Sequence, residues 1–263
     1  MSTPPMSRPA PPPRSWLVPA GLLAFSGITV WAVIEVRLDP LAILAGLSGA
    51  DRIMSDLLDP DWSFLGNTVR PMLETFQMAV IASAIGCAVA LPLAFVASRV
   101  TTPNRFAYAL DRSVLNVIRA VPDILYALIF VSAVSIGPLA GILALILFNI
   151  GVVAKLLSET VDGVDTGPIE AARAAGANRT QVVGTSVLPQ VMPNYIAYSL
   201  YTFELNIRAS TVIGIVGAGG IGQLLNTQRQ FFAYSNVSVI IIELFVFVFL
   251  IELISIWLRR RLV

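Results

Sequence analysis

Residues 75–98 read TFQMAVIASAIGCAVALPLAFVAS and contain no charged side chain. An apolar stretch of about 20 residues is long enough to cross the hydrocarbon core of a bilayer as an α-helix. Small residues recur at every fourth position, so they share one helix face and allow a second helix to pack closely. These residues are Ala82, Gly86, Ala90 and Ala94. The stretch therefore predicts a membrane-spanning helix in close contact with another helix.

The apolar character extends over the whole chain. Of its 263 residues, 56% are hydrophobic and 13% are charged, and the mean hydropathy is +0.80. A soluble domain usually has about 25% charged residues. We predict an all-α fold, a polytopic transmembrane helical bundle of about six spans. The other predicted spans are 17–34 (within a first helix at 16–36), 113–136, 139–157, 190–213 and 237–258.

The segments between the spans differ in charge. Residues 1–15 are rich in proline and predict a disordered cytoplasmic tail; a signal peptide is the alternative, which the length of the next apolar stretch and the lack of a nearby Ala-x-Ala-like cleavage site disfavour. Arginine marks the cytoplasmic side of a membrane protein. This rule places the loop 158–189 and the basic C-terminus 259–263 inside, with both chain ends, and the acidic loop 37–71 outside.

The chain lacks the residues that several kinds of chemistry need. It has no His and one Cys, Cys87, which excludes an internal disulfide, a Cys/His zinc site and a Ser-His or Cys-His catalytic pair. It also lacks the GxxxxGK[ST] loop that binds nucleotide phosphates. We therefore expect no catalytic residue, no metal, no cofactor bound by this chain and no ATP hydrolysis by it. The net charge of +1 gives no reason to expect nucleic acid as a partner.

The loop 158–189 begins with the features of a short helix. Pro168 suits the first turn of a helix, and Glu170 lies near its positive end. Gly176 can end the helix in a left-handed conformation.

A second short helix follows in the same loop. Asn178 and Gln181 have the spacing of a capping box at its start. We expect Pro189 to end it. The result is a bent helix pair across the membrane surface, which either carries no partner or docks one.

The spacing within this loop resembles the EAA loop of ABC importer permeases. That family has Glu-Ala-Ala, three residues, Gly, and a short helix ending in Leu-Pro. The resemblance implies a type I ABC importer permease-like fold and a loop that docks to a separate ATPase subunit, in which ATP and Mg²⁺ bind. The implied ATPase-docking residues are Glu170, Ala171, Ala172, Arg173, Gly176, Leu188 and Pro189.

Three further segments resemble the permeases of phosphonate transporters. They are Arg119-Ala-Val-Pro122-Asp123, Ser158-Glu159-Thr160 and the glycine-rich run 208–222. The resemblance covers the transmembrane domain at 72–258. It implies a permease of the bacterial inner membrane that forms the path for phosphonate, phosphate or a related oxyanion. It also implies a second permease copy in a homodimer, two ATPase subunits and an extracytoplasmic substrate-binding protein.

Other functions remain alternatives at this stage. Methionine importer permeases share the Ser-Thr and glycine-rich element, so methionine or another small solute is the first alternative. An ion-coupled secondary transporter is the second, and it would leave the docking loop unexplained. A membrane enzyme is disfavoured because His and clustered carboxylates with metal spacing are absent.

The glycine-rich run contains Gly217, Gly219, Gly220 and Gly222. It satisfies the GxGxxG pattern of dinucleotide sites, but that pattern requires a preceding strand, and here a predicted membrane span precedes it. The run is either a flexible turn at the outer surface or a broken or re-entrant segment near the mouth of the path. In the second case we expect it to act as part of a gate.

Two pairs of opposite charges lie within the predicted spans. Arg119 and Asp123 are four residues apart, as are Glu204 and Arg208, so each pair can lie on one helix face and partly neutralise itself. Charges in a membrane span are costly and usually face a partner or a water-filled path. Both pairs are candidates for the translocation path, with purely structural pairing as the alternative.

Further polar residues accompany these pairs. Ser210 and Thr211 follow Arg208 and are included among the path candidates. An arginine fork suits an oxyanion. Glu243 and Glu252 in the last span have no partner evident in the sequence.

Overall fold

The computed structural model describes residues 16–262 except 40, 43–45 and 47–49. The predicted tail 1–15 lies outside the described residues. The chain divides into two compact units, Met1–Arg52 and Ile53–Val263. The first unit holds helix α1 (Leu17–Glu35). Apolar side chains cover α1 on all sides and are exposed in the single chain, as is typical of a helix that faces lipid.

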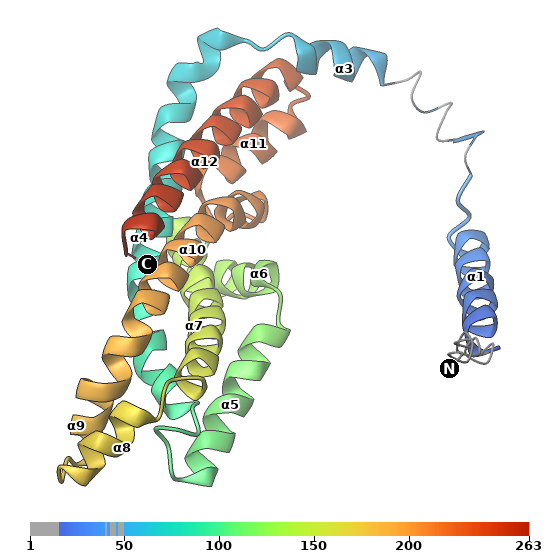
Figure 1. Ribbon diagram of the computed structural model, residues 1–263. Helices are drawn as coiled ribbons and strands as arrows, with labels where there is room; N and C mark the ends of the chain where they lie inside the picture. Colours follow the sequence, from blue (N-terminus) through green and yellow to red (C-terminus); the bar gives the residue numbers. More distant parts are fainter. Residues whose placement is uncertain (1–15, 40, 43–45, 47–49, 263) are drawn as a thin grey trace, which may run out of the picture. The chain divides into compact units, whose positions relative to one another are not determined.

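The second unit is a bundle of helices (Figure 1). No strand occurs among the described residues, so the predicted all-α fold class is confirmed. The elements are α3 (Asp51–Leu58, which begins at the end of the first unit), the 3₁₀ turn η1 (Trp62–Phe64), α4 (Leu65–Val96), α5 (Arg105–Ala120), α6 (Asp123–Val134), α7 (Pro138–Asp162), α8 (Gly167–Ala174), α9 (Arg179–Val182), the π turn η2 (Val183–Val187), α10 (Leu188–Ile215), α11 (Gly220–Gln230) and α12 (Tyr234–Leu262).

Helices α4 and α7 form the centre of this bundle. The predicted small-residue stripe of α4 is buried in full, as close helix contact requires. A Cβ placed on Gly86 would lie 2.5 Å from Cβ of Asn149 in α7 and 3.2 Å from the carbonyl oxygen of Ile146. The two backbones can therefore approach this closely only because Gly86 has no side chain.

The predicted span 113–136 is wrong as a single straight helix. It divides into α5 and α6, which are bent by 88° relative to one another, and Figure 1 shows α6 lying across the end of α5. Val121, at the bend, is extended (φ −90°, ψ 123°) because the ring of the following Pro122 disfavours the helical conformation there. Arg119 and Asp123 therefore do not share a helix face.

Within the described residues, five helices are long and apolar enough to cross a membrane, or six if the bent pair counts as one span. Some predicted boundaries shift. The predicted loop 37–71 contains α3 and η1, and α4 begins six residues before the loop's predicted end, at Leu65. Helix α12 continues through the basic run to Leu262, so Arg259, Arg260 and Arg261 are helical.

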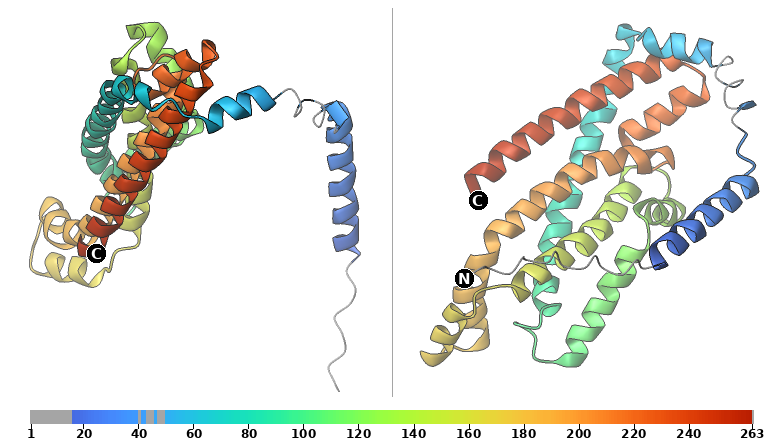
Figure 2. Two further views of the ribbon diagram at one scale, coloured as in Figure 1. Left: turned by 90° about the horizontal axis from the view of Figure 1, so that it is seen from above. Right: turned by 45° about the vertical axis from the view of Figure 1, so that its right-hand side comes forward.

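The second unit has two distinct ends. Helices α8 and α9 lie at one end, and the start of α4 with the turn between α11 and α12 lies at the other (Figures 1 and 2). The hydroxyl groups of Ser235 and Ser238 in α12 donate to the carbonyl oxygens of Asp56 and Leu57, at 3.2 and 2.6 Å. These bonds fix the second end around the start of α12.

Candidate functional site

The first half of the loop 158–189 forms the predicted helix. Pro168 lies in the first turn of α8 together with Glu170. Gly176 follows the helix with φ of +86°, a conformation that glycine adopts without steric cost. The N–H of Ala177 donates to the carbonyl of Ala172 at 3.0 Å, which satisfies a free carbonyl at the helix end. The predicted left-handed stop at Gly176 is confirmed.

The second half also forms a helix, with one correction. The capping box is present: the N–H of Gln181 donates to Oδ1 of Asn178 at 2.9 Å, and the N–H of Asn178 donates to Oε1 of Gln181 at 2.8 Å. Pro189 does not end this helix. The chain passes from α9 through the π turn η2 directly into α10, with Pro189 in the first turn of α10. The wider π turn accommodates a residue without an N–H, so the helix bends and continues.

The helix pair α8–α9 has an apolar inner side and an exposed outer side. Ile169, Val182 and Val187 are buried in the same core cluster as Leu157 and Val161 of α7. Most of the predicted docking residues, including Glu170, are exposed. The buried apolar residues hold the helix pair against the bundle, and its outer side exposes one acidic group and small alanines.

Polar contacts connect the helix pair to the neighbouring helices. Nε2 of Gln190, at the start of α10, donates to the carbonyl of Ser186 at 2.7 Å and to that of Asp165 at 3.3 Å. The hydroxyl of Ser186 donates to the carbonyl of Pro168 at 3.1 Å. These bonds connect the start of α8, through η2, to the start of α10.

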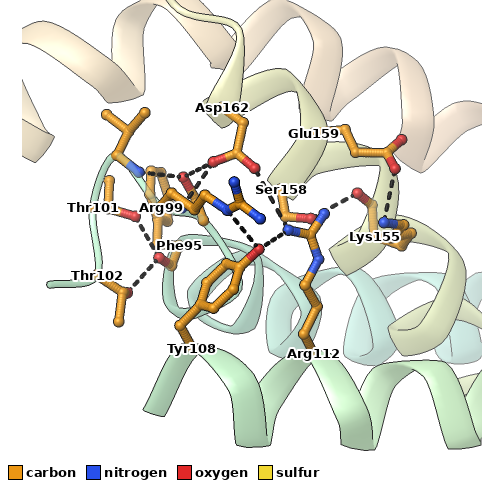
Figure 3. Close-up of polar contacts among 12 residues, drawn as sticks. Phe95, Arg99, Thr101, Thr102, Tyr108, Arg112, Lys155, Ser158, Glu159 and Asp162 are labelled. Atoms are coloured by element: carbon orange, nitrogen blue, oxygen red, sulfur yellow. Dashed lines mark hydrogen bonds and ion pairs between the residues drawn. The ribbon is translucent and has the colours of Figure 1, made fainter. Parts of the chain in front are cut away.

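Asp162, the last residue of α7, joins three helices at this end (Figure 3). Its Oδ1 accepts from the hydroxyl of Ser98 at 2.7 Å and from the N–H of Arg99 at 2.8 Å, and its Oδ2 lies 3.8 Å from the guanidinium of Arg112. Tyr108 accepts hydrogen bonds from both arginines. Because α8 begins at Gly167, five residues after Asp162, this cluster connects the start of the helix pair to α5 and to the segment that follows α4.

The resemblance to ABC importer permeases implies that an ATPase docks at this end, so replacing Asp162 with Ala is expected to weaken the coupling between ATP hydrolysis and transport. The substitution removes two charge-assisted hydrogen bonds, each contributing about 1.5–3 kcal/mol before exposure reduces it. Asp162→Asn is the matched control, since it keeps the shape and one acceptor oxygen. Measuring transported solute per ATP hydrolysed in reconstituted vesicles should give the order wild type, Asn, Ala. Equal ratios in all three proteins would contradict the role of this link.

A surface cavity lies beside the helix pair. It has a volume of about 220 Å³ and is lined by Arg99, Arg173 and Arg179 together with apolar side chains of α8, α9 and η2. The hydroxyl of Tyr108 raises the pKa of the Arg99 guanidinium, which is charged at any physiological pH. The cavity is therefore basic.

The glycine-rich run forms a buried turn between α10 and α11. Gly217, Gly219 and Gly220 have φ values of +93°, +84° and +70°, where a side chain would be strained. Ala218 is fully buried. The N–H of Gly217 donates to the carbonyl of Gly214 at 3.0 Å, and the N–H of Gly137 donates to the carbonyl of Gly217 at 2.9 Å. The turn is packed inside the protein, which favours a broken segment over a flexible surface turn.

Two side chains of α4 accept hydrogen bonds from the free backbone N–H groups at the start of α11. The N–H of Gly220 donates to Oε1 of Glu74 at 2.8 Å, and the N–H of Ile221 donates to the hydroxyl of Thr75 at 2.8 Å. A carboxylate at a helix N-terminus is favourable because the helix dipole is positive there. Free backbone groups inside a membrane protein need such partners.

The same turn has no room for side chains. A Cβ on Gly214 would lie 2.6 Å from the carbonyl oxygen of Gly219 and 2.8 Å from Cα of Gly222, and a Cβ on Gly222 would overlap the carbonyl oxygen of Thr211. The four predicted gate glycines therefore lie together, with Gly214 as a fifth member that the sequence analysis did not single out. Whether they gate transport stays a prediction.

The pair Glu204 and Arg208 forms within α10, as its spacing predicts. Arg259 of α12 joins it, with its NH2 group 3.2 Å from Oε2 of Glu204. The sequence analysis had assigned Arg259 only to the basic C-terminus. Two residues further along α10, and so on the opposite side of the helix, Nδ2 of Asn206 donates to the hydroxyl of Ser83 in α4 at 2.7 Å. Glu204 therefore faces α12, whereas Asn206 faces the charge-free stretch of α4.

The remaining path candidates differ in their placement. Arg119 and Asp123 form no ion pair with one another, but both line a cavity of about 330 Å³ at the bend between α5 and α6. The hydroxyl of Ser210 is buried and donates to the carbonyl of Ile207, as does that of Thr211. Both hydroxyl groups therefore already donate their hydrogen bond to a backbone carbonyl within α10.

Glu243 and Glu252 stay without an assigned partner. No ion pair to either occurs among the described residues. Oε2 of Glu243 is buried and makes no hydrogen bond within the part of the chain that the structure describes.

This helical fold, with the helix pair α8–α9 between two membrane helices, defines a class of membrane transport protein. Residues 90–263 match the family model of binding-protein-dependent transport system inner membrane components. The chain belongs to this family and is the permease component of an ABC importer, a multi-pass membrane protein.

Individual relatives refine this assignment. The chain is 40% identical over 224 residues to the phosphite transport system permease protein PtxC of Stutzerimonas stutzeri, covering 85% of this chain and 82% of that protein. It is 37% identical over 238 residues to the phosphate-import permease protein PhnE of Mycolicibacterium smegmatis, covering 90% of this chain and 45% of that protein.

A solved structure supports the fold. A chain of the MetNI methionine ABC transporter, in inward facing conformations, superposes with a TM-score of 0.68 at 24% identity, covering 77% of this chain and 99% of that one. The predicted fold class and family are confirmed.

Proposed function

We propose that this chain forms the translocation path for phosphite, phosphonate or phosphate-type oxyanions in an ATP-driven importer. Its similarity to a phosphite permease over most of both chains is the observation that carries the substrate class. Methionine is the second candidate, because a methionine transporter has the same fold. That structure, at 24% identity, speaks for the fold alone. Permeases named for methionine or D-methionine transport are 26–30% identical over 58–69% of this chain, against 40% over 85% for the phosphite permease.

The exposed face of α8, with Glu170, Ala171 and Arg173, is the docking surface for the ATPase in this proposal, and Ala172 packs against the core beneath it. Alanines let a partner surface approach closely, and Glu170 supplies one acidic contact. The chain itself does not hydrolyse ATP; nucleotide and Mg²⁺ bind in the partner. The hydrogen bonds from α8 to α10 then carry the movement of the ATPase into the membrane helices.

The complete importer would contain two copies of this chain. One copy supplies half of a path, and a two-fold axis is the usual symmetry of homo-oligomers. Two ATPase subunits would bind at the α8–α9 end, on the cytoplasmic side. A substrate-binding protein would dock at the opposite end, and both chain termini would lie in the cytoplasm, in keeping with the distribution of arginine.

ATP hydrolysis by the purified complex tests the substrate class. The complex of permease, ATPase and cognate binding protein is reconstituted in lipid vesicles and supplied with phosphite, phosphate, methylphosphonate or methionine. We expect at least one oxyanion to stimulate hydrolysis and methionine to have no effect. Stimulation by methionine alone would contradict the proposed substrate.

A further inference from the structure

Glu204 is a buried carboxylate that two arginines share. Its Oε1 accepts from Arg208 of the same helix, and its Oε2 accepts from Arg259 of α12 at 3.2 Å. The side chain of Glu204 is 8% exposed, whereas those of Arg208 and Arg259 are 49% and 31% exposed. The carboxylate is therefore enclosed, while the guanidinium of Arg208 reaches open space.

This cluster carries an unmatched positive charge. Two guanidinium groups face one carboxylate, and arginine does not lose its proton in proteins. No second carboxylate pairs with either arginine within the described residues. An unmatched charge beside membrane helices is costly unless water or a counter-ion reaches it. The cluster is suited to receive one anion.

The two arginines have different attachments. Nε of Arg259 donates to the carbonyl of Ser255 at 3.3 Å, within its own helix, so its guanidinium is held from two sides. For Arg208, Glu204 is the only partner in the part of the chain that the structure describes. Arg208 is therefore the arginine that can exchange its partner.

We propose that Arg208, Glu204 and Arg259 form an oxyanion-binding station. The anion takes the place of Glu204 on the fork of Arg208, and Arg259 keeps the carboxylate paired. An unpaired buried carboxylate would be strongly destabilising, so Arg259 makes the exchange feasible. The return of Glu204 to Arg208 then releases the anion, as conduction requires. This inference rests on the proposed function and adds Arg259 as a positioning residue.

The test is uptake of radiolabelled phosphite and phosphate by the complete importer in vesicles with internal ATP. Arg208→Gln is expected to lower uptake by about 30-fold, because the anion loses its charge-assisted hydrogen bonds to the guanidinium. Arg259→Gln is expected to lower it by about tenfold, because Glu204 then holds Arg208 permanently. Arg260→Gln, in the neighbouring position without a described ion pair, is the matched control and should transport normally.

A double variant separates this role from simple structural pairing. In Glu204→Gln/Arg259→Gln the cluster keeps its single positive charge and Arg208 is free to take the anion, but no carboxylate displaces the anion afterwards. Uptake should therefore recover only in part, above that of Arg259→Gln and below that of the control. Uptake of Arg259→Gln at the control rate, or a double variant no better than Arg259→Gln, would overturn the proposal. Thermal unfolding of each purified complex checks that the variants fold.

Two arms keep the outcomes distinct. If the unaltered importer transports neither anion, the proposed function fails; if it transports one but the variants do not follow the expected order, only the station fails. Vesicles of phosphatidylcholine alone and with added phosphatidylglycerol separate a free anion from a lipid headgroup. The order of the variants should be the same in both, and an order seen only with the anionic lipid would overturn the proposal.

Discussion

Replacing Glu170 with Arg is expected to abolish transport by separating the permease from its ATPase. Glu170 is exposed on α8, and Ile169 beside it is anchored in the core, so the substitution changes the docking face without disturbing the packing beneath. Like charges brought together at an interface cost several kcal/mol, and each 1.4 kcal/mol is tenfold in affinity. We expect affinity for the ATPase to fall by about 100-fold or more.

Co-purification of the ATPase with tagged permease in detergent measures this effect. Asp59→Arg is the control, because it makes the same charge change between α3 and η1, at the end of the unit remote from α8. The control should retain the ATPase. Retention of the ATPase by Glu170→Arg at the level of the unaltered protein would contradict docking through this face.

Replacing Gly219 with Val is expected to unfold the turn between α10 and α11 and to stop transport. The residue has φ of +84°, and its Cβ would lie 2.8 Å from Oε1 of Glu74 and 2.9 Å from the nitrogen of Pro138. An unfavourable backbone conformation costs about 1–3 kcal/mol, and overpacking costs about 1–3 kcal/mol more. A sum of about 2–6 kcal/mol is a large part of the stability of a typical domain.

Uptake by the importer and thermal unfolding of the purified chain report the two parts of this prediction. Gly66→Val in α4 is the matched control, since nothing lies within 4 Å of its Cβ and its φ is ordinary. Val at position 219 should lower both uptake and melting temperature, and Val at position 66 should change neither. If the 219 variant transported at the normal rate, neither the packing nor the proposed gate would stand.

Local patterns predicted much of this structure. The apolar stretches 75–98, 139–157, 190–213 and 237–258 correspond closely to the membrane helices α4, α7, α10 and α12. The capping box at Asn178 is also as predicted. These features depend on residues close in sequence, where helix periodicity and backbone preference act directly.

The errors arose where two local rules compete. Hydropathy joined residues 113–136 into one span, but Pro122 forces Val121 out of the helical conformation and the helix breaks. Proline predicts a helix end at Pro189, but the π turn η2 carries the helix past this residue into α10.

The contact between Glu204 and Arg259 could not be predicted from one sequence. The two residues are on different helices, and several arginines in the chain could have paired with Glu204. Only the packing of α12 against α10 selects Arg259. The same holds for Glu74, whose contact with Gly220 depends on how α11 meets α4.

The most direct test of the central claim is uptake of radiolabelled phosphite or phosphate into vesicles that contain the permease, with the ATPase and binding protein added or omitted. An ATP-driven importer requires all components and internal ATP, and it should accumulate the oxyanion without any ion gradient. Uptake by the permease alone, driven by a proton or sodium gradient and unaffected by Glu170→Arg, would contradict this account.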